Sequence, residues 1–392
     1  PLNGMPDVRR DGTPLNNSFD WGPIDVTAED MPDGAIATWA VETLAADHDQ
    51  PFFLGVGFYR PHQPLFAPRG YFADFPTDEV QLPVTLSSDL DDLSFYAQRL
   101  AKYPLTAGSH ATVLEYQQWE SAVAAYLACV KFVDDQLGRV IDALDASPHR
   151  ENTWIVVLSD HGYPLGEKDH WGKFTPWSES TRVPLLIVPP RDANSADWAR
   201  SKNVTAPVSL IDLYPTLVEI CEINSPNHDL DGRSLTPFLT PAADAETNDR
   251  FAVTSVGRGT QTVVDEAYRY VRYFDGSEEL YDRQSDPHEH HNLAHQRRFD
   301  TLKHELQSHL PEDPAVAHFV RYQSLKIILF AAPDQSPITY AITPGTGIGG
   351  GIGETRDVSG QHAELLDRVQ AYLATTPAAP KHLVLTPQEL KK

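Results

Sequence analysis

The sequence contains the stretch Trp154-Ile-Val-Val-Leu-Ser-Asp-His-Gly-Tyr-Pro-Leu-Gly-Glu-Lys-Asp-His-Trp-Gly-Lys-Phe174, in which an apolar strand opens into a polar loop. Within fourteen residues this loop gathers charged and imidazole side chains, namely Asp160, His161, Glu167, Lys168, Asp169, His170 and Lys173. In open α/β sheets, ligands bind beyond the carboxyl ends of the strands, where the loops converge on a crevice. We therefore expect this loop to hold a metal ion, to bind an anion, or to do both.

Each of these side chains also has a structural interpretation. Asp160 and His161 offer a carboxylate oxygen and an imidazole nitrogen, which can bind a divalent ion if further ligands come from elsewhere. Alternatively, Asp160 caps the loop and His161 is a half-buried histidine with satisfied hydrogen bonds. Lys173 lies between two aromatic residues and can present its ammonium group to an anion, or it can be a solvated surface lysine.

A second candidate loop lies earlier in the chain. Residues 52–57, Phe-Phe-Leu-Gly-Val-Gly, form a short apolar run of the kind expected for a buried parallel strand, and a helix at 33–47 is expected before it. The run leads into a proline-stiffened turn with Arg60 and His62. His62 can act as a general acid near neutral pH, because histidine alone has an unperturbed pKa in that range. A histidine after a strand can equally be structural.

The middle of the chain carries the clearest periodic pattern. Apolar residues from Trp119 to Leu144 alternate in steps of four and three, which predicts a helix of about seven turns. Strands are expected at 153–158 and 183–188. Ser209 with Asp212 forms a capping-box pattern before a further helix.

The first thirty residues and residues 64–112 show no such pattern. Both are rich in proline or in small polar residues, so we expect loop in the first case and a long irregular surface segment in the second.

The C-terminal part changes to short alternating segments separated by turns, which predicts a small antiparallel sheet with strands at 251–256, 261–264, 268–273 and 279–281. A helix at 299–310 would cover one face. In the tail, residues 326–330 can form a strand. Gly345, Gly347 and Gly350 fit G-x-G-x-x-G, but they lack the strand and helix that a dinucleotide site requires, so a flexible loop is favoured.

Together these elements indicate an α/β fold with a mixed, mostly parallel sheet flanked by helices and a smaller C-terminal antiparallel sheet. We expect residues 1–240 to belong to the large domain and residues 251–310 to a small α+β subdomain. Residues 324–392 form a tail of unknown structure.

Composition excludes several classes of protein. The chain has 392 residues, is 41% hydrophobic, and carries a formal net charge of −24, which argues against a nucleic-acid partner. Cys129 and Cys221 are too few for a disulfide scaffold or a cysteine-rich zinc site. No stretch approaches the ~20 apolar residues of a membrane span. Because the chain opens on Pro1 without an initiator Met or a signal peptide, we expect a processed or truncated product.

Three blocks of sequence resemble the type I sulfatases of the alkaline phosphatase superfamily. The first is 51–64, which is most similar to iduronate-2-sulfatase-like members. The second comprises Ser159-Asp-His-Gly162, Leu165-Gly-Glu167, Trp171-Gly-Lys-Phe174 and Thr181-Arg-Val-Pro-Leu185. The third comprises Glu279-Leu-Tyr-Asp282 and Asp286-Pro-His-Glu-His-His-Asn-Leu293. Together these blocks span roughly residues 20 to 310.

The resemblance implies a sulfuric ester hydrolase. It implies a calcium ion, or less often magnesium, held by Asp160 and His161 with two acidic residues from an earlier strand. It also implies that Lys173 contacts the sulfate and that His62 stabilises or protonates the leaving alcohol oxygen. We further expect Arg60, Lys168 and His170 to contact the substrate, although relatives commonly carry histidine where this chain has Lys168.

The family's nucleophile is a formylglycine made from the Cys or Ser of a Cys/Ser-x-Pro-x-Arg motif, and this sequence contains no such motif. We therefore predict that the chain lacks an N-terminal catalytic segment and does not hydrolyse sulfate esters alone. The expected substrate is a sulfated carbohydrate, and the family implies export to the periplasm or beyond. The alternatives are a phosphonate or phosphodiester hydrolase and a non-catalytic binding module that keeps the fold.

Overall fold

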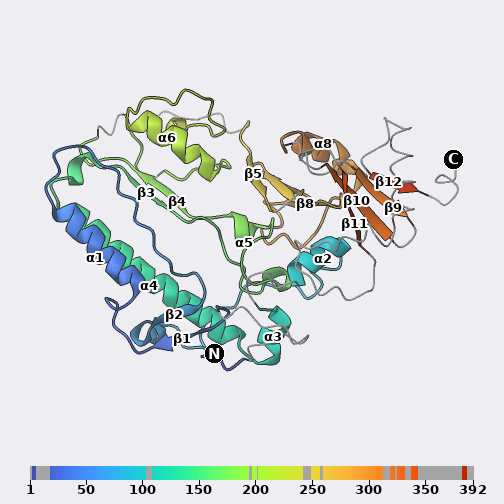
Figure 1. The fold of residues 1–392 in the computed structure, drawn as a ribbon, viewed down its shortest axis with the longest axis horizontal. Coiled ribbons are helices and arrows are strands. Elements are labelled where there is room, and N and C mark those ends of the chain that lie inside the picture. The colour runs from blue at the N-terminus through green and yellow to red at the C-terminus, as the bar shows by residue number, and fades with distance from the viewer. Residues whose placement is uncertain are drawn as a thin grey trace.

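The computed structural model describes residues 2–5, 18–102, 108–193, 197–200, 202–241, 249–256 and 259–311 and the strands 318–322, 325–331, 337–342 and 382–385. Two long helices form one border of the molecule (Figure 1). Helix α1 (Pro32–Ala45) packs along α4 (Trp119–Ala146), as Figure 1 shows. The buried side chains of Ala37 and Ala40 are small, which allows the two helices to approach closely. Both predicted helices are confirmed.

The inner face of α4 supports two parallel strands. Strand β1 (Trp21–Ile24) pairs in parallel with β2 (Leu65–Pro68), and both pack on α4 in one apolar cluster. The expectation of loop throughout the first thirty residues is thus wrong at β1. A four-residue strand carries too little alternation to be recognised in the sequence, and it is the parallel partner that stabilises it.

Residues 64–112 are also more regular than expected. Besides β2 they contain α2 (Phe95–Lys102) and α3 (His110–Glu115). Residues of this region are buried against distant parts of the chain, because Leu93 and Leu100 share an apolar cluster with Trp177. Tertiary burial stabilises short helices that local sequence does not indicate.

Strand β3 (Ile155–Leu158) pairs with β4 (Leu185–Val188) in antiparallel register, which confirms both predicted strands. Since β1 and β2 pair in parallel, the expected large domain, residues 1–240, contains both parallel and antiparallel strand pairs. Residues 52–57 are not a strand. Their side chains still alternate, because Leu54 and Val56 pack on the cluster between α1 and α4 whereas Phe53 is 84% exposed. A strand needs a hydrogen-bonding neighbour, and no strand in the described part of the chain pairs with this run.

The smaller antiparallel sheet is confirmed. Its strands follow chain order and comprise β5 (Ala252–Ser255), β6 (Gln261–Val264), β7 (Tyr268–Arg272) and β8 (Glu278–Asp282). Helix α8 (Asp300–Ser308) covers one face by burying Leu306 against Tyr270 and Leu280. The opposite face buries Val271 and other side chains beside Trp177, which follows the polar loop of the large part.

Three shorter helices complete the described fold, α5 (Ser178–Thr181), α6 (Leu213–Ile220) and α7 (Thr236–Leu239). The expected capping box is present, since the backbone N–H of Ser209 donates to the Asp212 carboxylate at 2.9 Å. No described helix has the length and apolarity to cross a membrane.

The tail contains a second four-stranded sheet. It is ordered β11 (Pro337–Ile342), β10 (Leu325–Ala331), β9 (His318–Tyr322), β12 (His382–Leu385), and β10 confirms the strand predicted at 326–330. The glycine pattern from Gly345 to Gly350 lies outside the described residues. The expected domain boundaries remain predictions.

Candidate functional site

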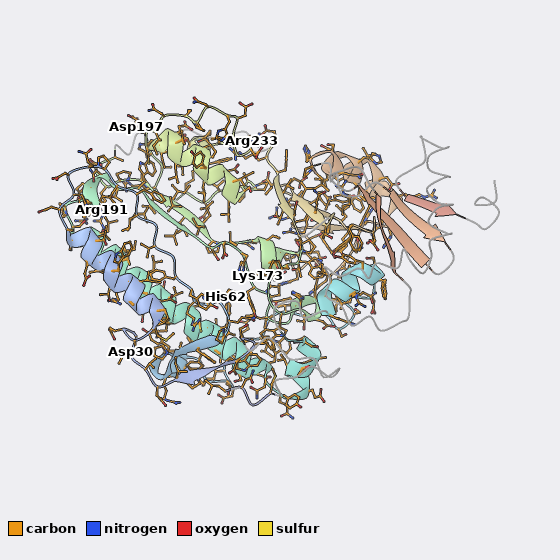
Figure 2. The ribbon with its side chains drawn as sticks, viewed as in Figure 1. Asp30, His62, Lys173, Arg191, Asp197 and Arg233 are labelled. Carbon is orange, nitrogen blue, oxygen red and sulfur yellow. The ribbon has the colours of Figure 1, made fainter. Side chains whose placement is uncertain are left out.

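Three of the predicted site residues meet at one point although they come from separate segments. The ammonium Nζ of Lys173 lies 2.9 Å from Nε2 of His161 and 3.4 Å from Nε2 of His62. His161 follows strand β3, and His62 follows the run 52–57. Figure 2 shows His62 and Lys173 next to each other in the middle of the molecule. The two loops chosen from the sequence therefore form one site.

The backbone sets the tautomer of both histidines. Nδ1 of His62 lies 2.8 Å from the carbonyl oxygen of Gln63, and Nδ1 of His161 lies 2.8 Å from that of Gly162. A carbonyl oxygen only accepts, so each Nδ1 carries the hydrogen. In the neutral rings, both Nε2 lone pairs then face the ammonium of Lys173. This arrangement leaves Nε2 of His161 able to ligate a metal and Nε2 of His62 able to exchange a proton.

Asp160 completes the polar end of strand β3. One of its oxygens accepts the backbone N–H of His161 at 3.0 Å, and the other lies 3.5 Å from Nε2 of the same histidine. The carboxylate is 83% exposed and open to a further ligand. Asp160 and His161 thus fit as two ligands of a divalent ion. Calcium takes six to eight ligands, and the described residues hold no group of three or more histidine, cysteine or acidic side chains suited to a metal.

Gly162 lets the loop after His161 turn against α5. Its backbone N–H donates to the carbonyl oxygen of Ser180 at 2.9 Å. A Cβ atom at this position would lie 2.0 Å from the carbonyl oxygen of Glu179, which no side chain can tolerate. The close approach therefore requires glycine and fixes the path of the chain directly after His161.

His170 lies behind Lys173. Its ring lies between two backbone carbonyl oxygens, with Nδ1 2.8 Å from that of Ala101 and Nε2 3.2 Å from that of Lys173. Burial lowers the pKa of His170, against a smaller opposite effect of these carbonyls. A neutral ring can donate to only one of these two carbonyl oxygens, and the shorter contact is the one to Ala101. The predicted contact of His170 with substrate remains a prediction.

Lys168 contacts other residues than His62, His161 and Lys173 in the described contacts. It is 4% exposed, and its ammonium donates to the Asp89 carboxylate at 2.8 Å and to the Glu289 carbonyl oxygen at 2.5 Å. The rings of Trp177 and Tyr281 flank the same ammonium at 5.5 and 5.0 Å. The expected substrate contact of Lys168 is untested and would require this ion pair to open.

Arg60 organises the loop that carries His62. Its guanidinium donates to the carbonyl oxygens of Phe66 at 2.7 Å and of His62 at 3.1 Å. The buried carboxylate of Asp33 accepts the backbone N–H groups of Tyr59 and Arg60. Sequence reasoning missed Asp33, because an acidic residue in the first turn of a helix indicates only a helix start. The substrate contact expected of Arg60 remains a prediction.

Comparisons with known proteins give a consistent result. The family model described as Sulfatase matches residues 7–223, and the one described as N-sulphoglucosamine sulphohydrolase, C-terminal, matches residues 166–315. A sulfatase of Formosa agariphila is 35% identical over 306 residues, which are 78% of this chain and 58% of that protein. Iduronate 2-sulfatase of Mus musculus is 27% identical over 242 residues, 52% of this chain and 43% of that protein. The chain therefore spans about half the length of these relatives.

A solved structure extends the comparison to the fold. The phosphonate monoester hydrolase SpPMH from Silicibacter pomeroyi is similar with a TM-score of 0.63 at 26% identity, and the match covers 78% of this chain and 63% of that chain. The helices and the mixed strand pairs of the large part, followed by the antiparallel sheet, thus form an arrangement known from solved enzymes.

Proposed function

The chain belongs to the sulfatase family, and from this we propose that it forms part of a sulfuric ester hydrolase that acts on a sulfated sugar. The observation that carries the proposal is the ammonium of Lys173 between the Nε2 atoms of His62 and His161. One fixed positive charge beside two imidazoles suits an anion whose leaving group must be protonated.

The geometry assigns a role to each side chain. Lys173 offsets the negative charge of the sulfate oxygens. For this contact, the bound anion takes the place of the histidine rings beside the Lys173 ammonium. When its ring carries a second proton on Nε2, His62 delivers that proton to the leaving alcohol oxygen and returns to the neutral tautomer, with Nδ1 still donating to Gln63. The chain's own residues therefore supply charge neutralisation and a proton.

We also propose that Asp160 and His161 hold a calcium ion, with magnesium as the alternative. The ion supplies Lewis-acid chemistry when bound. The exposed carboxylate of Asp160 and the Nε2 lone pair of His161 support this proposal, and the remaining ligands would come from outside the described residues.

We further propose that a segment preceding residue 1 of the same protein supplies those ligands and the formylglycine nucleophile. Three observations support a missing neighbour. The run 52–57 has no strand partner among the described residues, and β3 pairs with β4 alone among them. Large apolar side chains of β3 and β4 are also exposed, namely Leu158, Leu186 and Val188. The chain's coverage of about half of its relatives agrees with this proposal. On this view the chain alone is inactive.

One experiment tests the proposal. The chain and a form extended upstream in its coding sequence are expressed separately and assayed with a chromogenic aryl sulfate. We expect turnover only by the extended form. Turnover by the isolated chain would contradict the missing-nucleophile proposal. An intact coding region without an upstream Cys/Ser-x-Pro-x-Arg motif would instead favour a binding module that keeps the fold.

The sugar substrate rests on relatives. The family model over residues 166–315 is described as N-sulphoglucosamine sulphohydrolase, C-terminal, and the mouse relative is named iduronate 2-sulfatase. The likeness of residues 51–64 to iduronate-2-sulfatase-like members supports the same substrate class. We also propose that the protein is exported to the periplasm or beyond. Turnover of sulfated disaccharides by the extended form would test the substrate class.

The phosphonate monoester hydrolase from Silicibacter pomeroyi favours a second candidate function, hydrolysis of phosphonates or phosphodiesters. Both substrates present a tetrahedral anion to the same positive centre. Comparing the kcat/KM values of the extended form for an aryl sulfate and for a phosphonate monoester decides between the two functions.

A further inference from the structure

We propose that the antiparallel sheet β5–β8 is a clamp that positions Lys173 by holding residues 166–178, here called the Lys173 segment, at both ends. Glu289 and Glu279 are its positioning residues. The inference rests on the role proposed above for Lys173. It adds a task for the small sheet, which donates no hydrogen bond to Lys173, His62 or His161 in the described contacts.

The first end of the Lys173 segment is held through Lys168. Its ammonium spans the Asp89 carboxylate and the carbonyl oxygen of Glu289, the residue that lies in the loop after β8. Lys168 itself has a positive φ of 49°. An L-residue keeps this backbone conformation only when surrounding contacts hold it, and the buried ion pair provides such contacts.

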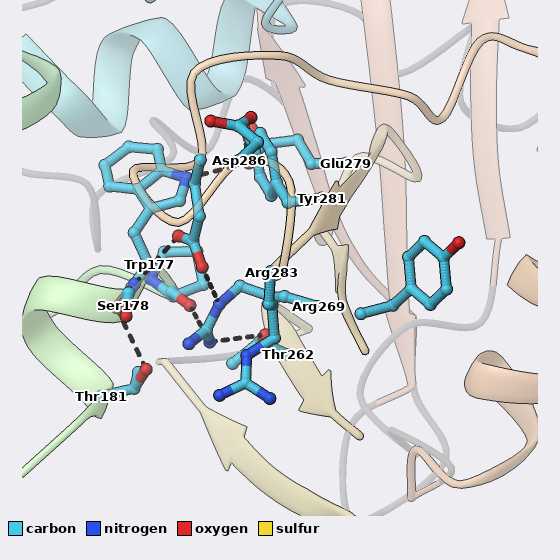
Figure 3. A network of polar contacts seen from close by, with 12 residues as sticks. Trp177, Ser178, Thr181, Thr262, Arg269, Glu279, Tyr281, Arg283 and Asp286 are labelled. Atoms are coloured by element: carbon cyan, nitrogen blue, oxygen red, sulfur yellow. Dashed lines mark hydrogen bonds and ion pairs between the residues drawn. The ribbon is translucent and has the colours of Figure 1, made fainter. Parts of the chain in front are cut away.

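The second end is held by the Glu289 side chain. Its carboxylate accepts the backbone N–H of Ser178 at 3.0 Å and the guanidinium Nε of Arg269 at 2.5 Å. Arg269 in turn donates to the carbonyl oxygen of Pro176 at 2.9 Å, and Figure 3 shows this guanidinium beside Trp177 and Ser178. Glu289 therefore contacts both ends of the Lys173 segment, Lys168 through its backbone carbonyl oxygen and Ser178 through its carboxylate.

Glu279 strengthens the second end. It is 0% exposed and accepts hydrogen bonds from Trp177 Nε1 at 2.8 Å, Tyr273 at 2.8 Å and Tyr281 at 2.9 Å. Burial raises its pKa, and the positive charge of Lys168 and the three donors oppose this shift. A buried carboxylate with three donors has few alternative positions, so it fixes the Trp177 ring and the backbone beside it.

Between these ends the segment is held by local bonds and by the large domain. Trp171 donates to His110 at 2.9 Å and packs in the apolar cluster on α4, and His170 lies against the carbonyl oxygen of Ala101. Gly166 N–H donates to the carbonyl oxygen of His170 at 3.0 Å, and Gly172 N–H donates to that of Pro164 at 3.4 Å. Lys173 lies between the two ends held by the small subdomain, so the position of its ammonium relative to His161 depends on that subdomain as well as on the large domain.

A spectroscopic test separates positioning from stability alone. The chain is labelled with nitrogen-15 at histidine, and the ring resonances of His62 and His161 are assigned with His→Gln variants. The variant Glu289→Gln keeps the side-chain size but removes the charge that Arg269 and Ser178 require. The control is Glu278→Gln. Glu278 precedes Glu279 in the sequence, accepts hydrogen bonds from Tyr270 and Lys303, and touches no part of the Lys173 segment in the described contacts.

We expect Glu289→Gln to shift the Nε2 resonances of His161 and His62, because the ammonium that faces them moves. Glu278→Gln should leave both unchanged even if it lowers the melting temperature. A folded Glu289→Gln chain with unchanged His161 and His62 resonances would overturn the clamp. Should Glu289→Gln not fold, Tyr281→Phe, which removes one donor to Glu279, is judged by the same criterion. The readout needs no sulfate turnover, so it stands whether or not the proposed activity does.

Discussion

The buried carboxylate of Asp33 accepts the backbone N–H of Arg60 at 2.9 Å, and its other oxygen accepts that of Tyr59 at 2.7 Å. Asp33 lies in the first turn of α1, so this pair of bonds ties the helix to the loop that carries His62. Hydrogen bonds to a carboxylate are stronger than those between neutral groups, and this carboxylate is buried.

We predict that Asp33→Asn lowers the free energy of unfolding by about 1.5–3 kcal/mol, the range for hydrogen bonds to a charged group. The amide keeps one acceptor but turns a donor toward a backbone N–H. Urea unfolding followed by circular dichroism measures the loss. Asp47→Asn, at an exposed position close to the end of α1, is the control and should change the stability by less than about 0.5 kcal/mol. Equal losses in the two variants would contradict the role of Asp33 in tying α1 to the loop that carries His62.

Lys168 and Asp89 form a buried ion pair at 2.8 Å. Lys168→Met leaves the Asp89 carboxylate buried without its partner, and we expect a loss of about 3–5 kcal/mol in unfolding free energy. The double variant Lys168→Met with Asp89→Leu should recover most of this loss, because no uncompensated charge remains. A double-mutant cycle from urea unfolding measures the coupling, and additive losses would show that the pair does not act as one unit.

The sequence predicts those parts of the fold whose patterns are long or chemically specific. The long apolar stripe of α4 and the capping box at Ser209 repeat a local rule, so both are recognised. The run 52–57 shows the limit. Its composition predicts burial on one face correctly, yet pairing depends on a neighbouring strand that local sequence does not reveal.

The same limit applies to the site. The sequence predicts His62, His161 and Lys173 as site residues because they follow apolar runs and match known motifs, and the structure brings them together. Asp33 and Glu289 were missed, since their partners Arg60 and Lys168 are 27 and 121 positions away. No periodic or local pattern encodes contacts over such separations, and only the folded chain shows them.

Lys173 should matter for turnover more than for stability. In the upstream-extended protein, we predict that Lys173→Ala lowers kcat/KM for an aryl sulfate by about 100- to 1000-fold, as for loss of one group that stabilises developing charge. The melting temperature should change little, because the ammonium contacts only the two histidine rings among the described hydrogen bonds. Lys102→Ala on α2 is the matched control. Equal activity of the two variants would remove Lys173 from the site.

Calcium gives a separate test of Asp160 and His161. Two ligands are too few for the six to eight that calcium takes, so calcium should not raise the melting temperature of the isolated chain. The upstream-extended protein should be stabilised by about 2.7 kcal/mol at a calcium concentration of one hundred times its Kd. Asp160→Asn should weaken this effect, as measured by calorimetry. Stabilisation of the isolated chain equal to that of the extended protein would contradict the division of ligands.

Glu179 on α5 makes stability depend on pH near neutrality. Burial raises its pKa from 4.5 to about 7, and the negative charges of Glu289 and, to a smaller extent, Glu167 act in the same direction, while Arg269 opposes them. The folded chain thus holds a proton on Glu179 at pH values at which the unfolded chain has released it. The resulting stabilisation is complete below about pH 4.5 and is lost as the pH rises through about 7.

The wild-type chain should lose free energy of unfolding between pH 5 and pH 8. We predict that Glu179→Gln reduces this loss by up to about 3 kcal/mol, because the amide cannot ionise. Urea unfolding at several pH values measures the slope for the wild-type chain, for Glu179→Gln and for the control Glu42→Gln at an exposed position of α1. The control should keep the wild-type slope. A Glu179→Gln slope equal to that of the wild type would mean that the carboxyl of Glu179 is already ionised in the folded chain at pH 5, and that Glu289 and burial do not hold its proton.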